Sequence, residues 1–160
     1  MEKSLYLFTI VLLYAEPKIW RRFHVPSTMN LERFHEIIQI VMGWYNYHLY
    51  EFIVKGRRFM PGDVDGEALE PCEHRLADVV SRKGEVMGYC YDMGDNWEHK
   101  IKLDDPNFIP PDAKRKIRCL DGARACPPED TGGVPGYFHF CEVVADPAHE
   151  DYEQLNEWSG

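Results

Sequence analysis

The sequence predicts an α+β fold in which a mixed, largely antiparallel sheet carries one helix packed on one face. Three segments support this prediction: an apolar run at residues 5–13, a helical pattern at 30–42, and an alternating pattern at 89–103. The chain has 160 residues, of which 44% are hydrophobic and 13% aromatic, enough to build a folded core. We therefore expect a single domain over residues 1–160.

The first half of the sheet is predicted from two extended segments near the N-terminus. The run from Leu5 to Leu13 predicts a central strand, because residues on both of its faces are apolar. A break at residues 15–17 separates it from a second extended segment, Ile19–Val25. A further strand is expected at residues 47–54, and a short helix at 76–80.

The main helix is predicted over residues 30–42. Apolar side chains recur there at three- and four-residue steps, the spacing of one helix face. Asn30, or Ser27-Thr28, supplies a cap at its start, and Gly43 ends it in a conformation that favours glycine. Phe34 and Ile38 lie on the apolar face and are expected in the core.

Residues 89–101 predict a tight β-hairpin around a loop of Gly94, Asp95 and Asn96. Apolar and polar residues alternate on both arms, which is the period of a strand. In this register Met93 faces Trp97, Tyr91 faces His99 and Tyr89 faces Ile101, all on the buried side. After it, the chain is expected to leave the sheet at residues 104–111, to be irregular over 113–134, and to end in an acidic helix at 150–158 that Asp146 caps.

The charge of the chain excludes one class of function. With 27 acidic and 18 basic residues the formal net charge is −9, which argues against nonspecific nucleic-acid binding, because phosphate contacts need a basic surface. The same acidity would suit a protein that mimics nucleic acid to occupy a basic partner. No membrane segment is expected, since the run at 5–13 is too short for a bilayer. Five irregularly spaced cysteines fit reduced thiols, so we expect a cytoplasmic protein.

Histidine, aromatic and acidic side chains gather in three segments that we interpret as a candidate ligand site. His48 shares a predicted strand face with Tyr50 and Phe52, and a titratable ring on an apolar face needs a partner. The same side chains would equally serve as core residues and turn formers. The candidate ligand-binding residues are His48, Tyr91, Asp95, Trp97, His99, Glu129 and Asp130.

Two alternative metal sites are open from the sequence. Thiols, an imidazole and a carboxylate are zinc ligands, which makes His99, Cys119, Cys126 and Asp130 one candidate set. His139 and Glu129 are the alternatives to His99 and Asp130 in this set. The second set is oxygen-rich and would hold a divalent ion that activates water. It joins His99 to the carboxylates of Asp92, Asp95, Glu98, Glu129 and Asp130, although strand alternation points Asp92 and Glu98 away from His99.

Five blocks of the sequence, in the same order, resemble the plasmid pRiA4b ORF-3-like family, also known as insertion-sequence passenger proteins of "TnpR" type. The resemblance implies an α+β domain and an association with mobile elements, and it carries no established activity. Many members of that family have a cysteine where this chain has Thr131, which weakens the thiol-based metal site. The blocks are residues 17–22, 43–44 with 48–52, 91–99, 126–133 and 136–137.

The sequence thus favours a noncatalytic binding or interaction module whose surface combines the hairpin at 91–99 with the loop at 126–133. Its partner would be a protein or a small molecule. The alternative is a metal-dependent hydrolase or nuclease that uses His99 and nearby carboxylates. Both interpretations require the loop to lie beside the hairpin and to bring Glu129 or Asp130 near Asp95 or His99.

Overall fold

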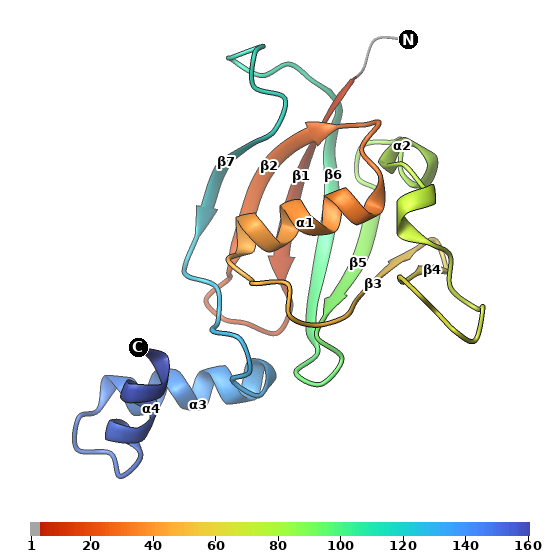
Figure 1. Ribbon diagram of the computed structural model, residues 1–160. Coiled ribbons are helices and arrows are strands. Elements are labelled where there is room, and N and C mark those ends of the chain that lie inside the picture. Colours follow the sequence, from red (N-terminus) through yellow and green to blue (C-terminus); the bar gives the residue numbers. More distant parts are fainter. Residues whose placement is uncertain (1–3) are drawn as a thin grey trace.

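The computed structural model describes residues 4–160 and contains one seven-stranded sheet with helix α1 across one face (Figure 1). All neighbouring strands pair antiparallel, which confirms the predicted fold class. The strand order is β4-β3-β5-β6-β1-β2-β7. The strands are β1 (Leu5–Leu12), β2 (Trp20–Pro26), β3 (Tyr50–Val54), β4 (Arg57–Phe59), β5 (Val86–Tyr91), β6 (Trp97–Phe108) and β7 (Arg118–Ala123).

Strand β1 occupies the middle of the sheet, between β6 and β2, as its apolar composition predicts. Every second side chain is buried, including Phe8, Ile10 and Leu12. These buried side chains face α1 and form the centre of the core, while the alternate residues are only partly covered. The strand therefore positions the hydrophobic layer on which the helix packs.

Helix α1 (Leu31–Met42) begins and ends where the sequence predicts. The Asn30 side chain accepts a hydrogen bond from the Arg33 backbone N–H, and Gly43 closes the helix with φ 96°. Phe34 and Ile38 are fully buried. The Phe34 ring lies 5.1 Å from that of Phe8, so the apolar face of the helix rests on the middle of the sheet.

The arms of the β5–β6 hairpin bury the predicted side chains, but their register differs by two residues. Met93, which was predicted on the buried side, lies in the connecting loop and is 43% exposed. Tyr91 pairs with Trp97, and Tyr89 pairs with His99, so the predicted partners were wrong. The connecting loop has five residues, because Asp92 leaves the strand with φ 61° and its backbone carbonyl accepts the Asn96 N–H. A shift of two residues preserves the alternation, and Trp97 and His99 remain buried as predicted.

Several predicted elements after the hairpin need correction. Strand β6 stays in the sheet to Phe108, and residues 118–123 of the segment expected to be irregular form edge strand β7. Strand β3 begins at Tyr50, so the residues before it form a loop. The helices other than α1 are η1 (Pro71–Glu73, a 3₁₀ turn), α2 (Leu76–Val79), α3 (Gly133–Ala145) and α4 (Tyr152–Ser159).

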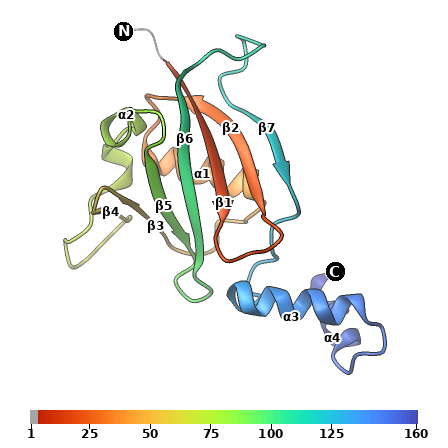
Figure 2. The ribbon, with the colours of Figure 1, turned by 180° about the vertical axis from the view of Figure 1, so that it is seen from behind.

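Helices α3 and α4 form a C-terminal arm, residues 133–160, at the end of the sheet where the β5–β6 hairpin turns (Figures 1 and 2). Only Gly133, Val134 and Val143 of α3 are buried, and no residue of α4 is. Asp146 lies at the C-terminal end of α3. The prediction that it caps the last helix was therefore wrong, because α4 follows Asp151. None of the helices within residues 4–160 has the length and apolarity needed to span a membrane.

Candidate functional site

The loop at 126–133 packs against the tip of the β5–β6 hairpin, as predicted. The Gly132 backbone N–H donates a hydrogen bond to Asp95 Oδ2 over 3.0 Å. At Gly133, where φ is 72°, an added Cβ would lie 2.5 Å from the Asp95 carbonyl oxygen. The chain can approach the hairpin this closely only because residue 133 has no side chain.

The Tyr91 hydroxyl links the loop at 126–133 to strand β5 through hydrogen bonds. Tyr91 is fully buried, and its hydroxyl lies 3.0 and 3.2 Å from the two carboxylate oxygens of Glu129, to which it donates. The same oxygen accepts the backbone N–H groups of Tyr47, at 2.9 Å, and His48, at 3.3 Å. Glu129 also accepts the Tyr45 backbone N–H at 2.7 Å. Burial raises the pKa of Tyr91, so the hydroxyl remains a donor.

Around this anchor, His48 meets three carboxylates. Its Nε2 atom lies 2.9 Å from Asp130 Oδ1, 3.5 Å from Asp92 Oδ2 and 3.7 Å from Glu129 Oε2. The structure therefore brings together His48, Tyr91, Glu129 and Asp130 of the predicted ligand-binding residues. Asp95 lies at the rim of this group, where it accepts the N–H of the loop.

Asp92 completes this group. The sequence placed it in the oxygen-rich metal set with His99, but did not predict that it meets His48. In a regular strand its side chain would point to the solvent face, but its left-handed φ turns it toward His48. Its Oδ1 atom accepts the backbone N–H groups of Gly94, at 2.9 Å, and Asp95, at 3.2 Å. The Asp-x-Gly spacing is a turn signal that could have indicated this bend.

Trp97 and His99 belong to the core and not to this surface. Trp97 is fully buried and His99 is 2% exposed. Burial lowers the pKa of His99 to about 4, and its Nδ1 atom lies 3.4 Å from the Tyr89 carbonyl oxygen. Among the described residues no carboxylate forms an ion pair with His99, so the carboxylates of the predicted oxygen-rich set do not surround this histidine.

The predicted thiol-based zinc set is not assembled. Cys119 is exposed on the edge strand β7, whereas Cys126 packs against the core and burial raises its pKa. The second histidine considered for this set, His139, is exposed on α3 beside Asp151. Within residues 4–160 the one group of three metal-ligating side chains close enough to share an ion is His48, Asp92 and Asp130.

A buried polar network beneath the site was also missed from the sequence. His35 of α1 shares short hydrogen bonds with the Tyr89 hydroxyl, 2.8 Å, and with Asn46 Oδ1, 2.7 Å. The Asn46 backbone N–H donates to Gln39 Oε1 over 2.8 Å. These contacts hold the loop between α1 and β3 on the helix, and so they fix the segment that presents His48.

That loop also exposes two aromatic rings, on residues whose backbone N–H groups donate to Glu129 and to the Tyr91 hydroxyl. Tyr45 and Tyr47 are 70% and 74% exposed, and their rings stack with centroids 5.8 Å apart. On the other side of Asp130, a cavity of about 400 Å³ opens between α3 and α4. Its lining includes Asp130, Phe140, Leu155 and Trp158.

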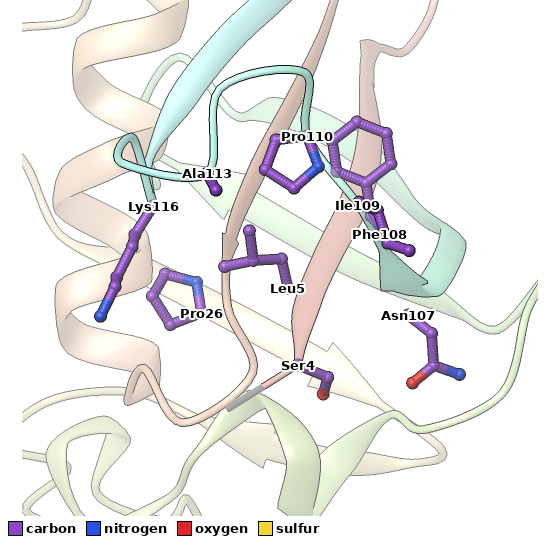
Figure 3. Close-up of a pocket in the computed structure, with 9 residues that line it drawn as sticks. All are labelled: Ser4, Leu5, Pro26, Asn107, Phe108, Ile109, Pro110, Ala113 and Lys116. Atoms are coloured by element: carbon purple, nitrogen blue, oxygen red, sulfur yellow. The ribbon is translucent and has the colours of Figure 1, made fainter. Parts of the chain in front are cut away.

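A second cavity lies at the opposite end of the sheet. It measures about 440 Å³ and is lined by residues at the start of β1, the end of β2 and the segment that joins β6 to β7 (Figure 3). Leu5, Pro26 and Phe108 form part of its apolar wall, and Lys116 is its one charged residue. None of the predicted site residues lines it, which separates it from the hairpin and loop.

Comparison with known proteins identifies a family, and the similar proteins found are described as uncharacterized or of unknown function. The family model described as "Plasmid pRiA4b ORF-3-like protein" matches residues 4–160. The uncharacterized protein y4hQ of Sinorhizobium fredii is 38% identical over 165 residues, which cover 100% of this chain and 83% of the relative. The crystal structure of a protein of unknown function, MM3350 from Methanosarcina mazei Go1, superposes with a TM-score of 0.87 at 32% identity, covering 100% of this chain and 92% of that one.

Proposed function

We propose that this chain, which belongs to the plasmid pRiA4b ORF-3-like protein family, is a noncatalytic module that binds a basic polypeptide segment. The binding surface is the hairpin–loop surface, made of residues 45–49, 92–96 and 126–133. Its similar proteins are uncharacterised, so the proposal depends on the chemistry of this surface. The observation that carries it is that exposed tyrosines and a group of carboxylates share this surface, and that within residues 4–160 no Lys or Arg forms an ion pair with Asp92, Glu129 or Asp130.

Charge supports a basic partner. Residues 125–160 contain eight Asp or Glu side chains and no Lys or Arg, so they hold nearly all of the formal net charge of −9. Within the described residues, the carboxylates of Asp92, Glu129 and Asp130 form ion pairs with His48 alone. A concentrated negative potential of this kind attracts cationic segments and accelerates their association.

The exposed rings and the cavity define the partner further. Tyr45 and Tyr47 offer open aromatic faces beside carboxylates, the arrangement that favours Lys and Arg side chains. The cavity between α3 and α4 shares Asp130 with this surface and ends at Trp158, which is 48% exposed. We therefore expect a segment that combines Lys or Arg with one large apolar side chain. These aromatic and apolar features favour a polypeptide over mimicry of nucleic acid.

The proposal also includes an association with mobile elements and a cytoplasmic location. An association with mobile elements fits the plasmid named in the family description. Cytoplasmic function fits the five cysteines, all of which are free thiols. Neither property affects the binding test.

Fluorescence anisotropy with two short labelled peptides tests the proposal. One peptide alternates Arg and Leu, and the other has Glu in place of Arg. We expect binding of the first alone, weakening as salt is added, because screening reduces interactions between exposed charges. Tyr47→Ala should weaken it about two- to fivefold, the value of an exposed cation–π contact. Ile109→Ala, an 88% exposed residue beside the second cavity, is the control. Equal affinity for both peptides, or an unchanged affinity in Tyr47→Ala, would refute the proposal.

A further inference from the structure

Four side chains from three separate segments converge at the base of the arm. His48 comes from the loop between α1 and β3, Asp92 from the hairpin, and Glu129 and Asp130 from the loop before α3. One ligand atom each of His48, Asp92 and Asp130 lies within 4.8 Å of the others. These donors are an imidazole nitrogen and two carboxylate oxygens, a mixed set that suits divalent first-row metals.

The group carries more negative charge than the residues at 4–160 neutralise. The side chains of Asp92 and Glu129 are 8% and 9% exposed, so their charges are largely withdrawn from water. Even a protonated His48 would leave the three carboxylates with an excess negative charge. Burying charge without a counterion is costly, which makes a cation the missing partner.

Two of the donor atoms have no hydrogen-bond partner among the described residues. His48 Nε2 is inaccessible to solvent and has no hydrogen-bond partner within residues 4–160, because the nearby Asp130 oxygen lies off its bonding direction. In Asp92, Oδ1 serves the turn, whereas Oδ2 receives no hydrogen bond from the described residues and faces His48 at 3.5 Å. Turn formation therefore accounts for one oxygen of this buried carboxylate and not for the other.

We infer that His48, Asp92 and Asp130 form a binding site for a divalent transition-metal ion such as Zn²⁺ or Mn²⁺. Glu129, which Tyr91 and the Tyr45 backbone hold in place, lies next to the site and adds negative charge. Such an ion would tie the hairpin and the α1–β3 loop to the segment that leads into α3. The inference does not rest on the proposed partner, because the ligands come from this chain alone.

Isothermal titration of ZnCl₂ and MnCl₂ into tag-free, chelator-treated full-length protein tests the site. We expect one ion per chain, and at least tenfold weaker binding in His48→Gln and in Asp92→Asn. His139→Gln is the matched control, because His139 also lies beside an aspartate, at 4.0 Å from Asp151, but in an exposed pair. Unchanged binding in His48→Gln, loss in the control alone, or no binding to the wild-type protein would overturn the inference.

A second readout avoids the variants and their folding. Bound Mn²⁺ is paramagnetic and broadens the NMR signals of nearby amides. The inference predicts that substoichiometric MnCl₂ first broadens the amides of His48, Asp92 and Asp130, whereas those around Ile109 stay sharp. Broadening that begins elsewhere, for example at His139, would contradict it. Both measurements are made without peptide, so failure of the metal site and failure of peptide binding are separate results.

Discussion

Replacing Tyr91 with Phe should loosen the attachment of the loop without disturbing the packing of the ring. The variant removes one hydroxyl that donates to Glu129 at 3.0 Å and accepts N–H groups of Tyr47 and His48 at 2.9 and 3.3 Å. A hydrogen bond to a charged group contributes about 1.5–3 kcal/mol and a neutral one about 0.5–1.5 kcal/mol. Because the Tyr47 segment is exposed, water can accept the Tyr47 N–H in the variant and replace part of the lost hydrogen bonding. We therefore expect a decrease of about 2–3 kcal/mol in the free energy of unfolding.

Urea denaturation followed by tryptophan fluorescence measures this change. Tyr14→Phe is the control, since the Tyr14 hydroxyl lies 3.4 Å from Glu98 and its side chain is 74% exposed. That variant should change the free energy of unfolding by less than about 0.5 kcal/mol. If Tyr91→Phe and Tyr14→Phe were equally stable, the Tyr91 hydroxyl would not fasten the loop.

Three further predictions concern stability. Phe34→Ala should cost about 2–5 kcal/mol in urea denaturation, because Phe34 is fully buried, whereas Ile40→Ala, at 71% exposed, should be nearly neutral. Since burial lowers the pKa of His99 to about 4, the unfolded chain, with a pKa of about 6.5, takes up this proton first. The contribution of His99 to stability is therefore complete above about pH 6.5 and is lost as pH falls toward the folded-state value; an NMR-titrated pKa near 6.5 would contradict this. Gly133→Ala should lower the thermal midpoint far more than Gly62→Ala, because both have positive φ but only the first would meet backbone at 2.5 Å.

Those parts of the fold that follow from local patterns could be predicted from the sequence. The alternation of β1 and the spacing of α1, with Asn30 and Gly43 at its ends, lie within short windows and follow directly from burial. The buried faces of the two hairpin arms were correct for the same reason, whereas Met93, in the loop, was wrongly placed on the buried side. Its register was not, since it depends on the left-handed turn at Asp92, which alternation does not reveal.

The missed elements have physical causes that a pattern search cannot detect. Strand β6 continues past Pro106 because a β-bulge opposite residues 5–7 of β1 accommodates it. Strand β7 is an edge whose residues are almost all exposed, so no alternation marks it. Helix α3 is capped by Gly132, and its first turn contains Gly133, Pro135 and Gly136, which are residues that usually indicate turns.

For the candidate site, the sequence indicated which residue types could bind a ligand, but not which of them lie close together in the fold. His48, Asp92 and Asp130 come from segments some forty residues apart, and only the folded sheet brings them together. His99 looked equally suitable, because an imidazole on a strand face signals either a site or a core. Its burial under Trp44 and Tyr89 decides for the core.

The most direct test of the account is residue-resolved mapping of peptide binding. ¹⁵N-labelled protein would be titrated with the peptide of alternating Arg and Leu while backbone amide shifts are followed. We predict the largest shifts at residues 45–49, 92–96 and 126–133, and none at the second cavity around Phe108 and Ile109. Shifts centred on that second cavity, or spread evenly over the sheet, would contradict the assignment of binding to the hairpin–loop surface.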